Sequence, residues 1–205
     1  MTEVGSPSFP RPQAERRAAT RATLLAAARP LFATRGYAAV GTEEIVRAAG
    51  LTRGALYHHF DGKEGLFTAV FEAVEEELLA RIAAGIEAAA PAGPLDALVV
   101  GIDVMLGAAC DPGLAQIVLL DAPAVLGWQR WREIGWRYGM GLTEGVLVAA
   151  IDAGELPEQP TRPLAHVLLG ALDEAVLYVA RAPEPRVAQD EMRRVLGDLL
   201  RALRV

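Results

Sequence analysis

The feature that most constrains this fold is the segment 42–63, TEEIVRAAGLTRGALYHHFDGK, which predicts two short helices joined by a tight turn. Thr42 is a suitable N-cap for the first helix, because its hydroxyl can accept a hydrogen bond from an amide of the first turn. Gly50 supplies the left-handed residue that ends this helix, and Thr52 caps the second one, RGALYHHF. The spacing therefore predicts a helix-turn-helix whose second helix has one free side.

The free side of the second helix carries residues that suit a DNA surface. Arg53 lies in the first turn, where a guanidinium can reach a base edge or a phosphate, and Ala55 is small enough to let the helix approach a thymine methyl. Tyr57 and His58 offer donors to phosphate oxygens, and Lys63 falls at the start of the next helix, which favours anions. We therefore expect this helix to enter the major groove.

The run LTRGALYHHFDGKEGLF, preceded by LFATRGY, resembles the DNA-binding domain of the TetR family of bacterial transcriptional regulators. The resemblance spans roughly residues 16–71 and includes the Gly36-Tyr37 and Gly50-Leu51 turns. By position it implies DNA contacts by Thr42, Arg53, Tyr57, His58 and Lys63, with Glu43 facing the groove. With Thr52 and Ala55 these residues form the predicted DNA-binding set.

Two residues depart from the family pattern. Glu43 is an acid where a basic or polar residue is common, although a carboxylate can accept from a cytosine amino group. Pro30 lies inside the predicted first helix, where it removes a backbone hydrogen bond and is expected to kink the helix. The sequence gives Pro30 no functional role.

The charge is divided unevenly along a chain whose formal net charge is −6. Residues 1–63 hold nine Arg or Lys against five Asp or Glu, a net of +4, while residues 64–205 hold eleven against twenty-one, a net of −10. An acidic total argues weakly against a nucleic-acid binder. The basic excess, however, coincides with the predicted DNA-binding part.

The periodicity predicts an all-α fold of about nine helices. We expect three parts: a disordered arm at residues 1–15, rich in Pro, Ser and Gly; a three-helix DNA-binding domain at 16–62; and a helical effector-binding and dimerisation domain at 63–205. Arg11, Arg16 and Arg17 either belong to a solvated tail, which is the favoured interpretation, or touch the DNA backbone.

The second domain begins with a helix predicted over residues 63–90. Its core stripe recurs at spacings of three and four and consists of Phe67, Val70, Phe71, Val74, Leu78 and Ile82. The acids expected to face water are Glu72, Glu75, Glu76 and Glu77. The last two helices are predicted at about 163–181 and 186–204, and the TetR resemblance implies that they form a four-helix homodimer contact.

A candidate effector pocket is drawn from the aromatic and polar residues of the apolar middle helices. It comprises Met105, Leu119, Trp128, Trp131 and Tyr138, with His166 and Asp173 as polar members. Trp128, Trp131 and Trp136 either wall a pocket or simply fill the core, and the core is favoured. His166 and Asp173 either line the pocket, or bond across the dimer contact or reach solvent at its rim. The second interpretation is favoured, because pockets are lined mainly by apolar groups and interfaces can be rimmed by polar ones.

The sequence supports other functional classes less well. An enzyme or metal site could use His58, His59, Asp61 and Glu64, but adjacent helical histidines point about 100° apart and cannot easily share one metal. A structural interaction module would leave the DNA-facing residues unexplained. Cys110 is either a redox sensor or a packing residue, and packing is favoured for a single thiol in an Ala-rich helix.

We expect neither an enzyme nor a bound cofactor or metal. The chain has no uninterrupted apolar run of about 18 residues and no signal-peptide core, so we expect no membrane span and a cytoplasmic protein. The predicted function is that of a ligand-responsive regulator, a repressor that binds a palindromic double-stranded operator as a homodimer. A small, largely apolar effector of unknown identity would release it from DNA.

Overall fold

The computed structural model describes residues 13–204, and every regular element in that range is helical. The N-terminal unit consists of α1 (Gln13–Ala39), α2 (Thr42–Ala48) and α3 (Arg53–His59), and α4 (Gly62–Ala89) leads away from it. The remaining elements are α5 (Pro94–Ala109), α6 (Pro112–Ala115), the π-helix η1 (Gln116–Asp121), α7 (Ala122–Leu126), α8 (Trp128–Asp152), α9 (Thr161–Arg181) and α10 (Pro185–Ala202). With the contiguous α6–η1–α7 segment counted as one, the described part has nine helices, and the all-α prediction is confirmed.

Helix α1 differs from the prediction at its start and at Pro30. It begins at Gln13, so the last three residues assigned to the arm are helical, while residues 1–12, including Arg11, lie outside the described part. The backbone remains helical through Pro30 and leaves the helical conformation at Gly36, where φ is 75°. The break in α1 therefore lies at a glycine that tolerates positive φ, and not at the proline.

The turn between α2 and α3 has the expected glycine geometry. Gly50 adopts φ 64°, the Leu51 amide donates to the Val46 carbonyl at 2.9 Å, and the Gly50 amide donates to the Arg47 carbonyl at 3.1 Å. This is a Schellman ending, and it reverses the chain within a few residues. Thr52 then caps α3 as predicted, its hydroxyl accepting from the Ala55 amide at 3.2 Å.

The predicted N-cap of α2 is wrong by one residue. Gly41, in an extended conformation, holds the capping position, and Thr42 is the first helical residue and makes no capping hydrogen bond. Val40 and Ile45 are both buried, and their packing fixes where the chain enters the helix. The Thr42 hydroxyl is therefore not committed to the helix terminus.

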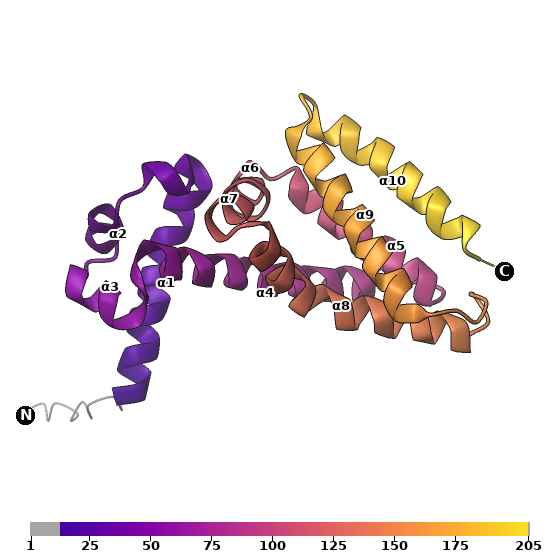
Figure 1. The fold of residues 1–205 in the computed structure, drawn as a ribbon, viewed down its shortest axis with the longest axis horizontal. Helices are drawn as coiled ribbons and strands as arrows, with labels where there is room; N and C mark the ends of the chain where they lie inside the picture. The colour runs from indigo at the N-terminus through magenta and orange to yellow at the C-terminus, as the bar shows by residue number, and fades with distance from the viewer. Residues whose placement is uncertain (1–12, 205) are drawn as a thin grey trace, which may run out of the picture.

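The core joins the N-terminal unit to α4. Phe32 and Phe67 are fully buried and meet edge-to-face with ring centroids 5.2 Å apart, and Tyr37 lies 5.1 Å from Phe67. Such aromatic contacts contribute beyond the area that they bury. Helix α4 continues from this cluster into the bundle of α5, α8, α9 and α10, so one rigid element belongs to both halves (Figure 1).

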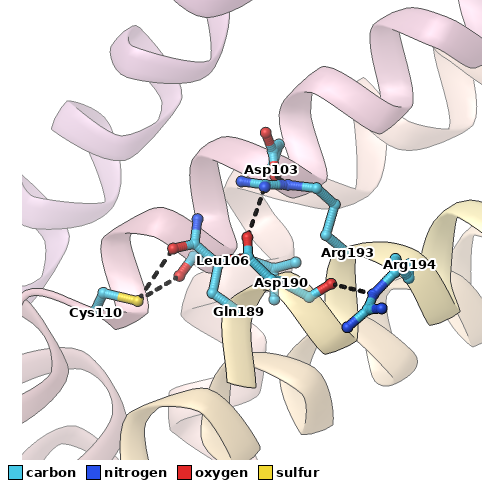
Figure 2. A network of polar contacts seen from close by, with 7 residues as sticks. All are labelled: Asp103, Leu106, Cys110, Gln189, Asp190, Arg193 and Arg194. Atoms are coloured by element: carbon cyan, nitrogen blue, oxygen red, sulfur yellow. Dashed lines mark hydrogen bonds and ion pairs between the residues drawn. The ribbon is translucent and has the colours of Figure 1, made fainter. Parts of the chain in front are cut away.

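Polar contacts attach α10 to α5 on the outer side of the bundle (Figure 2). Arg193 forms an ion pair with Asp103 and a second one, at 2.9 Å, with Asp190. The Cys110 sulfur lies 3.4 Å from the Gln189 side-chain oxygen, and burial raises the pKa of the thiol. A thiol kept protonated is a poor nucleophile, so the structure favours packing over redox sensing for Cys110.

Helix α9 is more apolar than the sequence analysis allowed. Among the described residues it is the one single helix long and apolar enough to cross a membrane by length and composition, with a mean hydropathy of 1.4. It carries Asp173 and packs on one side against α5, α8 and α10. Val167 and Tyr178 remain exposed on its surface.

Candidate DNA interface and ligand cavity

The free side of α3 presents Arg53 and Tyr57 together. The guanidinium of Arg53 lies 5.5 Å from the centre of the Tyr57 ring, and the Arg53 side chain is 62% exposed. Glu43, from α2, lies 3.6 Å from Arg53 and is itself 83% exposed. An exposed ion pair of this kind contributes little to stability, so it leaves Arg53 available to another anion.

The rest of the predicted DNA-binding set lies around this pair at the α2–α3 turn and along α3. Thr52 and His58 are exposed, and Thr42 and Ala55 are half-buried. A surface groove brings His58 and His59 close to Arg16 and Arg17 at the start of α1. Arg16 and Arg17, which the sequence left between a solvated tail and a DNA contact, thus share one surface with α3.

Lys63 lies in a different environment from the other predicted contacts. Its ammonium sits 4.0 Å from the centre of the Tyr37 ring, and burial lowers its pKa while the nearby Asp121 acts in the opposite direction. This cation–π contact draws Lys63 toward the junction between the N-terminal unit and the bundle. Its access to DNA is therefore more restricted than the sequence predicted.

A hydrogen-bonded clasp connects that junction to η1. The Tyr37 amide donates to the Asp121 carboxylate at 2.6 Å, and the Gln116 amide side chain donates to the other carboxylate oxygen at 3.0 Å. Gly36 is needed here, because a side-chain carbon at that position would lie 3.1 Å from Gln116. Because the Tyr37 amide donates to Asp121 of η1, and Gln116 of η1 holds the same carboxylate, the clasp ties the Gly36-Tyr37 turn to the bundle.

A cavity of about 130 Å³ lies among α4, α5, η1, α8 and α9. A volume of this order accommodates a molecule the size of benzene. Of the candidate pocket set, Met105, Leu119, Trp131, Tyr138 and Asp173 line it. Trp131 is buried and also lines the cavity. At this residue the core interpretation and the pocket-wall interpretation therefore both apply.

Trp128 and His166 do not line this cavity, so their placement in the pocket is wrong. Trp128 begins α8 and is 53% exposed, with its ring against Trp131. His166 is exposed and packs against Trp136, with ring centroids 4.2 Å apart. His166 and Asp173 share a helical face, but seven residues separate them by about 10 Å along the axis, so only one of the two reaches the cavity.

The polar centre of the cavity contains a residue that the sequence analysis expected in water. Glu75 projects from α4 into the cavity, where burial and the neighbouring Asp173 raise the pKa of its carboxyl to about 7. Burial also raises the pKa of Asp173 to about 6, although Arg132 opposes the shift from 3.8 Å away. The prediction that Glu75 faces solvent is wrong, because it shares the stripe of Phe71 and Leu78.

Arg132 and Trp136 complete this centre. The Arg132 guanidinium lies 4.2 Å from the centre of the Trp136 ring. The Arg132 Nε and the Trp136 indole nitrogen are buried donors without a hydrogen-bond partner, although the indole lies close enough to Asp173 to oppose the rise in the pKa of that carboxyl. Unpaired buried donors are rare, so these two nitrogens mark the polar part of the cavity beside Asp173.

The signal for Glu75 was available in the sequence, whereas the signal for Arg132 was weak. Glu75 follows Phe71 by four residues and precedes Leu78 by three, which is the spacing of one helical face. Trp136 was one of the three tryptophans considered as a pocket wall, and it does line the cavity. Arg132 lies on α8, where many positions are polar and no period singles it out.

The residues weighed as a possible metal site do not cluster in the described part of the chain. Within residues 13–204, no three His, Cys, Asp or Glu side chains lie close enough to hold a metal ion. The His58 and His59 rings lie 5.2 Å apart at 82°, so they point in different directions.

The chain matches two family descriptions in order along its length. Residues 24–70 match "Bacterial regulatory proteins, tetR family", and residues 95–203 match "Tetracyclin repressor-like, C-terminal domain". The first match contains α2, α3 and the DNA-facing residues, and the second contains α5 to α10.

Individual proteins agree with these matches. A TetR-family transcriptional regulator from Pectobacterium atrosepticum is 34% identical, with a TM-score of 0.82 over 95% of this chain and 98% of that one. The Transposon Tn10 TetC protein of Escherichia coli is 26% identical over 77% of this chain and 79% of its own length. The HTH-type transcriptional repressor KstR2 of Rhodococcus jostii is 37% identical over 38% of this chain and 39% of its own length.

The helix-turn-helix geometry, the cavity in the helical bundle and these matches lead to one assignment. The chain belongs to the TetR family of transcriptional regulators and is a DNA-binding protein of that family.

Proposed function

We propose that this protein is a cytoplasmic, ligand-responsive repressor without enzymatic activity. In this proposal residues 16–62 bind DNA, residues 63–205 bind the effector and dimerise, and a small, largely apolar effector releases the operator. The observation that carries it is the path of α4, which starts at the DNA-binding unit and supplies Glu75 and Leu78 to the cavity wall. The likeness to KstR2 supports repression as the mode of action.

In the DNA complex we expect α3 to lie in the major groove. Arg53 is the residue proposed to read a base edge, because its guanidinium is exposed and already stands over Tyr57. Tyr57, His58 and Thr42 would contact phosphates, and Arg16 and Arg17 would extend that contact along the backbone. Thr52, Glu43, Ala55 and Lys63 complete the proposed interface.

We propose that the homodimer forms through α9 and α10. Among the described residues these helices expose five large apolar or aromatic side chains, Val167, Tyr178, Val187, Val195 and Leu199. A surface of this kind is costly to leave in water, and a second copy would cover it. Two DNA-binding units related by a two-fold axis would require a palindromic operator.

Two connections support coupling between cavity and DNA. The first is α4 itself, held to the N-terminal unit by Phe67 and entering the cavity at Glu75. The second is η1, in which Leu119 lines the cavity and Asp121 holds the Tyr37 amide. A ligand that binds the DNA-free arrangement more tightly would lower DNA affinity by the same factor, and a few kcal/mol would suffice.

The test is selection of bound duplexes from a random DNA pool at a fixed salt concentration. Arg53→Ala is compared with Arg130→Ala, which removes the same charge from an exposed arginine of α8. We expect an enriched palindrome that Arg53→Ala loses or relaxes and Arg130→Ala retains. Folded, dimeric protein that enriches no sequence would contradict the proposal.

A further inference from the structure

The cavity contains one more acidic side chain than its basic residues can neutralise. Arg132 is the one basic side chain that lines it, and this residue already lies beside Asp173. Glu75 enters the cavity from α4 as a half-buried side chain, and no donor in the described part of the chain hydrogen-bonds to its carboxyl group. A carboxylate among apolar neighbours and beside a second acid, without a hydrogen-bond donor, is disfavoured, so either a proton or a cationic partner stabilises this group.

The surroundings of Glu75 define what such a partner must look like. The cavity volume of about 130 Å³ limits the partner to about one ring and a short substituent. Aliphatic side chains and the aromatic residues Trp131, Trp136 and Tyr138 make up most of the wall. Aromatic faces attract cations as well as apolar groups, so they favour the same class of molecule as the carboxylate does.

We propose that the effector of this protein is a small lipophilic organic cation, an inference that rests on the proposed function. Its ammonium or amidinium group binds the Glu75 carboxylate, and its apolar body packs against the aromatic wall. An anion would face Glu75 and Asp173 together. A neutral molecule would leave the charge of the Glu75 carboxylate uncompensated. Anions and neutral molecules should therefore both bind less tightly than a cation of the same size.

The titratable groups around Glu75 predict that affinity for a cation depends on pH. Asp173 faces Glu75 from α9 and Arg132 and Tyr138 line the cavity from α8, whereas α5 and η1 contribute no titratable side chain to the lining. The pKa of Glu75 is raised to about 7, so most of the carboxylate is ionised at pH 8 and most is protonated at pH 6. Affinity for a cation should therefore fall about tenfold between these values, with a further contribution from Asp173.

The experiment uses titration calorimetry of the full-length dimer with three matched probes: benzylamine, benzyl alcohol and benzoate. These share one ring and one short substituent and differ in charge. We expect benzylamine to bind about tenfold or more tightly than benzyl alcohol at pH 8, and benzoate to bind least. Benzyl alcohol or benzoate binding as tightly as benzylamine, or no detectable binding of benzylamine, would overturn the proposal.

Glu75→Gln keeps the shape of the side chain and removes its charge. In this variant the preference for benzylamine over benzyl alcohol should disappear, together with most of the pH dependence. Glu87→Gln removes an exposed acid from the same helix and should behave as the unmodified protein does. A preference that survives in Glu75→Gln would show that another group binds the cation.

The proposed function and this inference fail separately. Operator binding is measured without any small molecule, so its loss concerns the regulator proposal alone. If benzyl alcohol released the operator and benzylamine did not, the proposal of a ligand-responsive regulator would stand and the proposal of a cationic effector would be refuted.

Discussion

The buried carboxyl of Glu75 makes the stability of this protein depend on pH in a direction opposite to that of a salt-bridged acid. Its pKa is about 7 in the folded protein, against an ordinary value of 4.5. At about 1.36 kcal/mol for each pKa unit, ionisation of the folded form costs about 3 kcal/mol. The folded state binds the proton more tightly between these two values, so its stability falls as the pH rises from below 5 to above 7.

Replacing Glu75 with glutamine removes this penalty. Relative to the unmodified protein, Glu75→Gln should gain about 3 kcal/mol of stability at pH 8 and less than about 1 kcal/mol at pH 5. Asp173 titrates in both proteins, so the difference between the two pH profiles isolates Glu75 to first order.

Urea unfolding at a fixed protein concentration measures this difference, with Glu87→Gln as the exposed control. The concentration must be fixed because dimer formation contributes to the apparent stability. A stability difference that is the same at pH 5 and pH 8 would refute the placement of Glu75 in the cavity. A loss of stability in Glu75→Gln at pH 8 would refute this placement of Glu75 even more directly.

Three further substitutions test the parts that hold the cavity and the DNA-binding unit together. Phe67→Ala should lower the free energy of unfolding by about 3–5 kcal/mol, because the ring is fully buried between Phe32 and Tyr37, and urea unfolding measures this. Asp121→Ala removes the acceptor of the half-buried Tyr37 amide and should cost about 1–3 kcal/mol in the same assay, and an unchanged midpoint would argue against the clasp. Thr52→Ala deletes the cap of α3 and should cost about 1 kcal/mol in thermal unfolding, whereas Thr52→Ser should restore most of it.

The helix-turn-helix was predictable because its signals are local. Gly50 needs positive φ, Leu51 follows it into the core side of the turn, and Thr52 bonds an amide three residues away. Each signal depends on a few neighbouring residues, so it survives without knowledge of the rest of the fold. The one local error, Thr42 as the N-cap, arose because Gly41 in an extended conformation fills the capping position equally well.

The cavity was harder to predict because it depends on how five helices pack. His166 and Asp173 share a face of α9, yet only Asp173 reaches the cavity, since the cavity ends between them along the helix axis. Glu75 was assigned to solvent by its residue type although its spacing placed it on the buried stripe. An acid on an apolar stripe is the sequence signal that deserves more weight than residue type alone.

The clasp between Tyr37 and Asp121 has no signal in the sequence. The two residues are 84 positions apart, and Asp121 lies in a π-helix, whose extra residue per turn shifts the side chains away from the α-helical period. Rare local geometry of this kind is visible only once the helices are packed.

The measurement that most directly tests the central claim, that filling the cavity weakens DNA binding, is operator affinity after the cavity has been filled by mutation. Gly135 lines the cavity, and a side chain there meets open space, so Gly135→Leu places apolar atoms where the effector would bind. Gly145→Leu adds the same side chain to an exposed position of the same helix, again into open space. We predict that Gly135→Leu, as a folded dimer, binds the selected operator about tenfold or more weakly, in line with a coupling free energy of about 1–3 kcal/mol, while Gly145→Leu binds it normally. Full operator affinity in a folded Gly135→Leu dimer would contradict the coupling.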